Sequence, residues 1–270
     1  MVKVLLMLAL ALSFGAVSAC QSKKADTPNK QANTAPANTA ANAANAAGEQ
    51  KVTINSPDGL KLVGTFYAAD KPNSPAVLLL HQWQSDRHSY DDFAKQLQGK
   101  GFAVLSIDGR GFGESTRAAD GMAVPADRTD AAVKAMLGDV GAAFDFLSTQ
   151  KNVDPARLGI VGASYGSSLA IIYGADNPKV KAIALLSPGL NYFGNMQTEP
   201  AIKKYGSRPL LMVAAADDKE SADSVNKLKA AAANDKYEIK IYEKGGHGNG
   251  LLNAGVGLDD LLEGFLGKAL

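Results

Sequence analysis

The sequence predicts an α/β fold, with a mostly parallel β-sheet, helices on both faces and an antiparallel hairpin at its N-terminal end. Two observations carry this prediction. Five short runs are almost continuously apolar, as expected for strands that are buried on both faces of a parallel sheet. Between the runs, apolar residues recur three and four positions apart, which is typical of helices that pack one face against a core. The five runs are residues 76–80, 102–107, 158–161, 180–186 and 209–214.

The chain before the first run predicts the hairpin. Residues 51–56 and 61–67 are rich in β-forming side chains and are joined by Pro57-Asp58-Gly59, which is turn chemistry suited to antiparallel strands. The longest helical pattern follows the second run and has apolar residues at Val133, Met136, Leu137, Val140, Phe144 and Leu147. The last helix has one apolar face, which we interpret as core packing, formed by Leu258, Leu261, Leu262, Phe265 and Leu266.

The N-terminus has the features of a secretory signal. Lys3 is followed by the apolar residues 4–12, which are too few to span a membrane, and then by small residues. The only cysteine, Cys20, follows Val-Ser-Ala at positions 17–19, a sequence that resembles the lipobox of bacterial lipoproteins. The resemblance implies that residues 1–19 are a signal peptide and that Cys20 becomes the lipidated first residue of the mature chain.

Residues 20–50 are predicted to form a disordered tether. They are mainly Ala, Asn, Thr, Lys, Gln and Pro, and without larger apolar side chains they cannot bury a core. With the lipid anchor, the tether implies a place in the bacterial cell envelope. The outer membrane or the cell surface is favoured, because Gln21 rather than aspartate follows Cys20. The remaining residues, 51–270, are long enough for one domain with a sizeable core.

Composition excludes several classes of function. Residues 51–270 contain 24 Lys and Arg against 25 Asp and Glu, so the domain has no excess of basic residues with which to bind nucleic acid. No cysteine follows Cys20, so the domain has no thiolate metal site, disulfide or cysteine nucleophile. Its glycine-rich segments match no phosphate-loop motif, and we expect neither a cofactor nor a metal ion.

Polar residues follow three of the predicted strands, in the order serine, acid and histidine. Ser164 stands in a Gly-x-Ser-x-Gly motif between a strand and a helix, the context in which a serine lies exposed on a strained turn. Asp217 and Asp218 follow a later strand, and His247 follows a strand predicted at 237–242. Ligands of such sheets bind at the carboxyl ends of the strands, so this edge is the expected site.

This order resembles that of the α/β-hydrolase superfamily, and the resemblance covers the whole of residues 51–270. Residues 108–115, DGRGFGES, are similar to the superfamily's turn after the fourth strand. Residues 154–166, DPARLGIVGASYG, are similar to its approach to the nucleophile. The nearest subgroups are dienelactone hydrolase-like and serine aminopeptidase-like members, and the first typically uses cysteine where this chain has Ser164. The resemblance implies an α/β-hydrolase fold.

Carried over to this sequence, the resemblance implies a catalytic triad. Ser164 would attack an acyl carbon, and His247 would accept the proton of the serine and return it to the leaving group. The acid would orient the imidazole. Asp218 fits this role better than Asp217, because the acid of the family stands nine positions after the proline that Pro209 matches.

The resemblance also implies an oxyanion hole formed by the backbone N–H groups of Tyr165 and Trp83. The loop that carries Trp83 departs from the family, because the usual His-Gly pair is His81-Gln82 in this chain. The glycine that normally lets the loop turn is therefore absent. The family uses the histidine of this pair structurally, and His88 is expected to be a solvated or packed histidine.

The sequence therefore predicts a serine hydrolase that cleaves small esters through an acyl-enzyme intermediate. The alternatives are an aminopeptidase-like amide hydrolase and a non-catalytic surface lipoprotein that keeps the fold as a binding module. Residues 187–208 are too few for a cap domain, so we expect an open site. Its rim, residues 116–128 and 191–198, is not rich in the contiguous large apolar residues that would bury a long acyl chain. The expected partners are a small acyl substrate and, through Cys20, a membrane, while the oligomeric state is left open.

Overall fold

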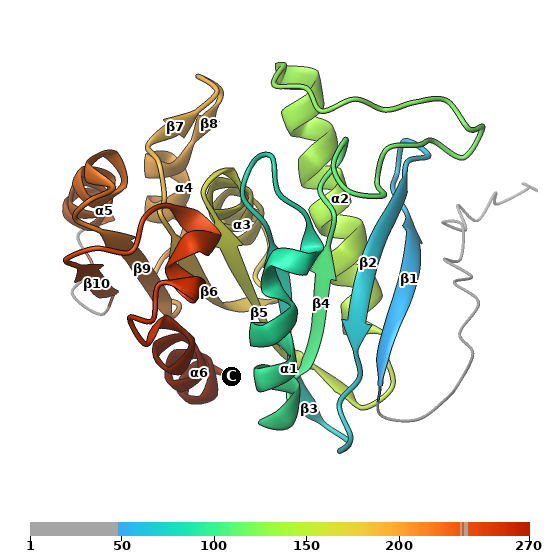
Figure 1. The fold of residues 1–270 in the computed structure, drawn as a ribbon, viewed down its shortest axis with the longest axis horizontal. Helices are drawn as coiled ribbons and strands as arrows, with labels where there is room; N and C mark the ends of the chain where they lie inside the picture. The colour runs from blue at the N-terminus through green and yellow to red at the C-terminus, as the bar shows by residue number, and fades with distance from the viewer. Residues whose placement is uncertain (1–47, 233, 235–236) are drawn as a thin grey trace, which may run out of the picture. The chain divides into compact units, whose positions relative to one another are not determined.

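Strands and helices alternate along the part of the chain that the computed structural model describes, residues 48–232, 234 and 237–270 (Figure 1). The strands are β1 Glu49–Asn55, β2 Lys61–Tyr67, β3 Ser74–Leu80, β4 Ala103–Ile107, β5 Val153–Ala163, β6 Val180–Leu186, β7 Asn191–Tyr192, β8 Met196–Gln197, β9 Leu210–Ala215 and β10 Glu238–Tyr242. The helices are η1 Arg87–Tyr90, α1 Asp91–Gly99, α2 Asp130–Ser148, α3 Tyr165–Asp176, α4 Thr198–Tyr205, α5 Lys219–Ala232, η2 Gly248–Asn253 and α6 Leu258–Ala269. None of these helices is long and apolar enough to cross a membrane.

Eight strands form one sheet in the order β1-β2-β4-β3-β5-β6-β9-β10. β1 and β2 form the predicted antiparallel hairpin, and β1 begins at Glu49, two residues before the expected start of the domain. β2 also runs antiparallel to β4, whereas all other neighbouring strands of the sheet are parallel. The prediction of a mostly parallel sheet with an N-terminal hairpin is confirmed.

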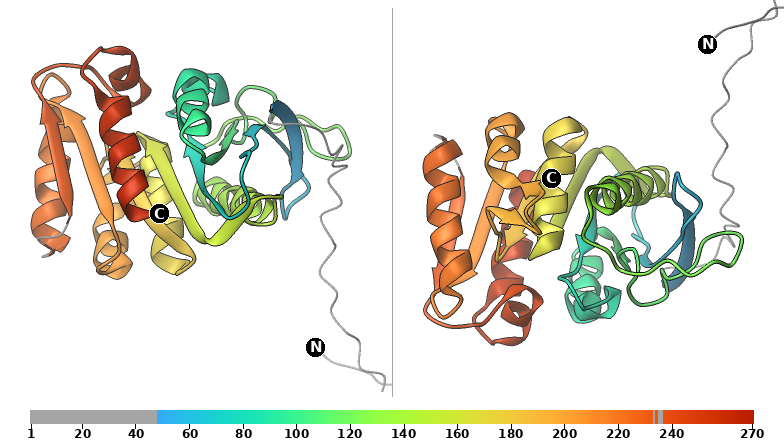
Figure 2. Two further views of the ribbon diagram at one scale, coloured as in Figure 1. Left: turned by 90° about the horizontal axis from the view of Figure 1, so that it is seen from below. Right: turned by 90° about the horizontal axis from the view of Figure 1, so that it is seen from above.

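Helices cover both faces of this sheet, as the sequence predicts (Figure 2). α1 and α6 pack on one face, and α2, α3, α4 and α5 pack on the other. In β3, Val77 and Leu79 belong to the core on the first face, whereas Leu78 and Leu80 belong to the core on the second. Because successive residues of a strand point to opposite faces, both faces need apolar side chains, which explains the unbroken apolar run.

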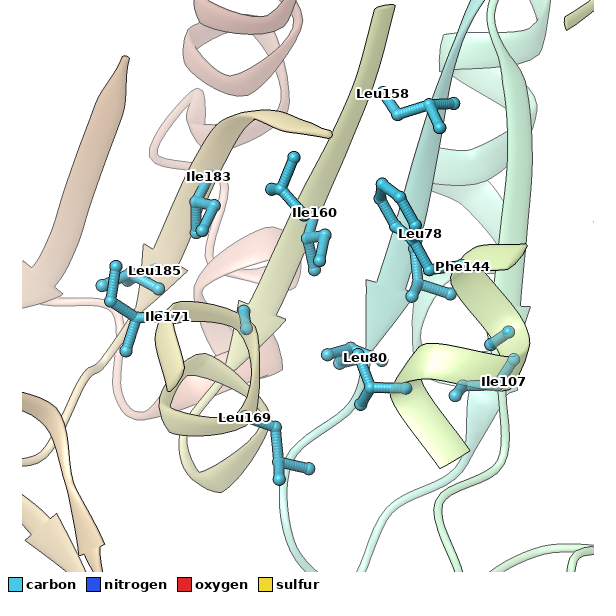
Figure 3. Packing of buried hydrophobic residues seen from close by; sticks show 14 of the residues in the cluster. Leu78, Leu80, Ile107, Phe144, Leu158, Ile160, Leu169, Ile171, Ile183 and Leu185 are labelled. Carbon is cyan, nitrogen blue, oxygen red and sulfur yellow. The ribbon is translucent and has the colours of Figure 1, made fainter. Parts of the chain in front are cut away.

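α3 is held against the sheet by aliphatic packing (Figure 3). Leu169 and Ile171 of α3 share one buried cluster with Ile160 of β5 and Ile183 of β6. Burying each such side chain contributes about 1.5–3 kcal/mol to folding. The packing fixes the N-terminal end of α3, directly after Ser164, relative to the carboxyl ends of the parallel strands.

The segment between β6 and β9 is short, as expected. It contains the two-residue strands β7 and β8 and the eight-residue helix α4, which packs against α3. The hydroxyl of Thr198 donates a 2.6 Å hydrogen bond to Gly189 O and ties the start of α4 to the chain that leaves β6. The buried Ile202 and Tyr205 belong to the main core, so this segment is not an independent cap domain.

Candidate active site

Ser164 occupies a strained turn between β5 and α3. Its backbone has φ 54° and ψ −123°, a conformation that a residue with a Cβ atom rarely adopts. Gly162 and Gly166 make the turn possible by close approach of the backbone. A Cβ atom on Gly162 would lie 2.2 Å from Gly166 O, and one on Gly166 would lie 2.6 Å from Leu80 O. The turn therefore has the strained geometry that the spacing of the two glycines predicts.

The structure brings Ser164, His247 and Asp218 together. His247 Nε2 lies 2.7 Å from Ser164 Oγ, and His247 Nδ1 lies 2.7 Å from Asp218 Oδ2. Ser164 as a whole is only 6% exposed, and the side chains of Asp218 and His247 are 14% and 42% exposed. Solvent therefore reaches the site on the side of the histidine. In this arrangement, the imidazole can take a proton from the serine while the carboxylate holds its other nitrogen.

The two adjacent aspartates have different partners. Asp217 accepts hydrogen bonds from the backbone N–H groups of Gly245 and Gly246, each 3.1 Å long, and so supports the loop before His247. Burial alone would raise the pKa of Asp218, but hydrogen bonds from Ser221, His247 and Ser187 outweigh it, and the pKa lies below the usual 3.8. Asp218 is therefore a charged partner for the imidazole at neutral pH.

Two residues after β6 that sequence reasoning missed support this arrangement. Ser187 is fully buried, accepts a 2.9 Å hydrogen bond from Gly248 N–H and bonds to Asp218, so it links the acid to the histidine loop. The hydroxyl of Tyr192 donates to Ser187 O at 2.9 Å and lies near the Ser164 hydroxyl. Burial raises the pKa of Tyr192, which keeps its hydroxyl protonated. The only feature of the sequence that pointed to Ser187 was its position directly after a predicted strand.

The two expected oxyanion donors are the backbone N–H groups of Tyr165 and Trp83. Neither has a hydrogen-bond acceptor within the described residues. Tyr165 is the first residue of α3, where the backbone N–H groups have no partner inside the helix. In the loop after β3, the positive φ of 60° falls on Gln84 and not on Gln82. The absence of glycine at position 82 therefore causes no backbone strain there.

The neutral form of His81 helps to hold the loop after β3 in place. Its Nε2 accepts a 2.7 Å hydrogen bond from Gly109 N–H, so its Nδ1 carries the proton and donates to Gln82 O at 2.7 Å. Burial lowers the pKa of His81 and favours this neutral tautomer. His88 lies on the surface, with Nδ1 2.8 Å from Asp91 Oδ2 and a side chain that is 52% exposed.

An aromatic cluster borders the nucleophile, and most of it lies outside the predicted rim segments 116–128 and 191–198. The centre of the Trp83 ring lies 4.7 Å from the ring centre of Phe112, 5.3 Å from that of Tyr165 and 4.8 Å from that of Phe193. The guanidinium of Arg128 lies over Trp83 and Phe193, at 4.8 and 5.0 Å from their ring centres. These rings come from four separate segments, and only Phe193 belongs to the predicted rim, so no single segment of the sequence reveals the cluster.

Within residues 48–232, 234 and 237–270, no three His, Cys, Asp or Glu side chains form a group that could hold a metal ion. The side chains that converge at the strand ends are a hydroxyl, an imidazole and a carboxylate. This combination can activate a nucleophile.

Known proteins are similar to this chain in sequence and in fold. The dienelactone hydrolase family matches residues 62–250. An uncharacterized protein of Mycobacterium tuberculosis is 29% identical over 226 aligned residues, with 77% of this chain and 76% of that protein covered. The esterase Pf2001 of Pyrococcus furiosus superposes with a TM-score of 0.66, at 16% identity, over 82% of this chain and 93% of its own. Dienelactone hydrolase from Anabaena variabilis superposes with a TM-score of 0.62, at 17% identity, over 83% and 98%. These likenesses confirm the predicted α/β-hydrolase fold.

Proposed function

Since the chain belongs to the dienelactone hydrolase family and is a hydrolase of the α/β fold, we propose that it is a serine esterase with an acyl-enzyme intermediate. One observation supports this proposal most: the imidazole of His247 lies 2.7 Å from both Ser164 Oγ and Asp218 Oδ2. A serine hydroxyl is a poor nucleophile unless a base is within hydrogen-bond reach. His247 is placed to be that base.

The proposed reaction has two halves. Ser164 Oγ attacks the ester carbonyl carbon while His247 Nε2 takes the hydroxyl proton, and His247 then gives this proton to the departing alcohol. In the second half, a water molecule loses a proton to His247 and attacks the acyl carbon. The bond to Ser164 breaks, and the serine regains its proton from His247. Asp218 stabilises the charged imidazole in both halves.

The proposed oxyanion hole stabilises the negative charge that develops on the carbonyl oxygen. The N–H group of Tyr165 lies at the N-terminus of α3, where the helix dipole also favours negative charge. The N–H group of Trp83 would be the second donor. Removing one such donor commonly lowers kcat by about 10²- to 10³-fold.

The expected substrates are esters with short acyl groups. The segment between β6 and β9 adds only a hairpin and an eight-residue helix. The half-exposed side chain of His247 shows that solvent reaches the site. A deep groove would contribute about 0.8 kcal/mol for each buried methylene, whereas an acyl chain that extends into water gains little. For p-nitrophenyl esters, we expect kcat/KM to be highest for acetyl or butyryl groups and to level off or fall beyond about eight carbons.

A chain-length series of p-nitrophenyl esters with the purified protein checks this expectation. A steep rise of kcat/KM toward dodecanoyl esters would contradict it and would indicate a lipase-like groove. The same assay can include aminoacyl p-nitroanilides. Faster hydrolysis of these amides than of the matched esters would favour the aminopeptidase-like alternative over the esterase.

We propose in addition that the mature chain is a lipoprotein of the bacterial cell envelope. The support lies in Lys3, in the apolar residues 4–12 and in Cys20 after three small residues, all of which fall outside the described residues, as does most of the predicted tether, 20–50. Expression in a bacterium with radiolabelled palmitate should label the protein, and Cys20→Ala should abolish the label. Equal labelling of this variant would contradict the anchor.

A further inference from the structure

Gln82 and Asn249 are joined by a reciprocal pair of hydrogen bonds. The backbone N–H of Gln82 donates to Asn249 Oδ1 at 3.0 Å, and the backbone N–H of Asn249 donates to Gln82 Oε1 at 2.8 Å. Each side chain thus binds the backbone of the other residue. Asn249 is only 4% exposed. The two residues are far apart in the sequence, and they connect the loop that precedes Trp83 with the loop that carries His247.

The residue between His247 and Asn249 leaves room for this pair. Gly248 has φ 59°, in the left-handed region that favours glycine. A Cβ atom at this position would lie 2.2 Å from Gln82 Oε1. Gly248 therefore provides both the turn after His247 and the space that the Gln82 amide fills.

The carbonyl of Gln82 is fixed as well. Its oxygen is 2.7 Å from His81 Nδ1 and accepts a 3.2 Å hydrogen bond from Ser85 N–H. This carbonyl and the N–H of Trp83 belong to the same planar trans peptide, in which the two groups point in opposite directions. Bonds that hold Gln82 O in place therefore also set the direction of the Trp83 N–H group.

We propose that Gln82 and Asn249 are positioning residues that fix the Trp83 N–H donor relative to the imidazole of His247. In this proposal, which rests on the proposed esterase function, the pair holds the oxyanion hole and the base at one distance throughout the reaction. Related loops usually have a glycine at this position. In this chain Gln82 stands there, and its hydrogen bonds with Asn249 link the two loops.

The test compares variants of Gln82 that keep or remove the acceptor at nearly constant size. Gln82→Met removes the acceptor for Asn249 N–H, whereas Gln82→Glu retains an oxygen at that place. Gln84→Met is the matched control, because Gln84 is exposed in the same loop and its side chain takes part in none of the hydrogen bonds of the described residues. For each variant, the unfolding temperature, kcat and KM for p-nitrophenyl acetate, and the inhibition constant of butylboronic acid are measured. The boronate forms a tetrahedral, anionic adduct with an active-site serine.

A misplaced catalytic group acts mainly on the transition state, and a displacement of about 1 Å can cost roughly 10²-fold in rate. We expect Gln82→Met to lower kcat and kcat/KM equally, by about tenfold, as for an interaction made only in the transition state. Binding of the boronate should weaken by a similar factor. Gln82→Glu and Gln84→Met should stay within about twofold of the wild-type protein in all kinetic constants.

Asn249→Ala and the double variant Gln82→Met/Asn249→Ala complete the test. If the two hydrogen bonds depend on each other, kcat of the double variant should be little lower than kcat of the slower single variant. If they act independently, the two reductions in kcat should multiply. Should the Asn249 variants not fold, the comparison of Gln82→Met with Gln82→Glu decides alone.

Two results would overturn the positioning role. One is a Gln82→Met protein with unchanged kcat and boronate affinity. The other is a lowered unfolding temperature with unchanged kinetics of the folded protein, which would indicate a purely structural link. A wild-type protein that neither hydrolyses p-nitrophenyl esters nor binds the boronate would overturn the proposed function itself, and the positioning role with it.

Discussion

Replacing Ser164 with alanine is expected to reduce kcat/KM for p-nitrophenyl acetate by about 10³-fold or more, the scale observed when a member of a triad is removed. The reason is that no acyl-enzyme can form without Oγ, the atom that lies 2.7 Å from His247 Nε2. The residual rate would come from the oxyanion donors and from substrate binding. Steady-state kinetics of the folded variant provide the measurement.

Ser168→Ala is the matched control for this variant. Ser168 lies on α3, the helix that begins directly after Ser164, and is fully buried, and its hydroxyl has no hydrogen-bond partner among the described residues. Removing an unsatisfied buried hydroxyl is neutral or stabilising, so we expect full activity and an unchanged or higher unfolding temperature. Ester hydrolysis at the wild-type rate by a folded Ser164→Ala protein would rule out the proposed mechanism.

The two aspartates should differ strongly when each is replaced by asparagine. Asp218→Asn should lower kcat by on the order of 10³- to 10⁴-fold, because the amide would donate to His247 Nδ1 and move the imidazole proton to Nε2. In that tautomer, His247 cannot accept the proton of Ser164. Asp217→Asn should lower kcat less than about tenfold, because the amide oxygen can still accept from Gly245 or Gly246.

The pH dependence of this comparison follows from the lowered pKa of Asp218. A carboxyl group whose folded-state pKa lies below its usual 3.8 keeps its charge above that value and loses it only as the pH falls further. Protonation of Asp218 should therefore add no pH dependence of its own to the comparison between pH 5 and pH 9. A larger loss of kcat in Asp217→Asn than in Asp218→Asn would show that Asp217 is the residue that orients the imidazole.

Local patterns in the sequence were sufficient to predict most of the fold. The apolar runs of β3 and β6 correspond to strands that are buried on both faces, and Pro57-Asp58-Gly59 lies at the turn between β1 and β2. The start of β1 at Glu49 was missed because Glu49 and Gln50 are polar residues on an edge strand, where one face is exposed. Hydrogen bonds to β2, rather than burial, keep them in the sheet.

The parts of the site that depend on chain order were predictable, and those that depend on contacts between loops were not. Ser164 could be singled out because two glycines beside it allow the strained turn. The roles of Ser187 and Asn249 come from hydrogen bonds to residues that lie far away in the sequence. Nothing in the residue types near Gln82 reveals that its side chain meets Asn249. The aromatic cluster around Trp83 was missed for the same reason.

Labelling with a fluorophosphonate probe, followed by peptide mapping, tests most directly whether Ser164 is an activated nucleophile, and it requires no knowledge of the substrate. One covalent adduct is expected, on the peptide that contains Ser164. Labelling should be absent in Ser164→Ala and strongly slowed in His247→Gln, because the histidine supplies the base. A folded wild-type protein that forms no adduct, or forms one only at another serine, would contradict the role of Ser164 as nucleophile and favour a binding module on a hydrolase fold.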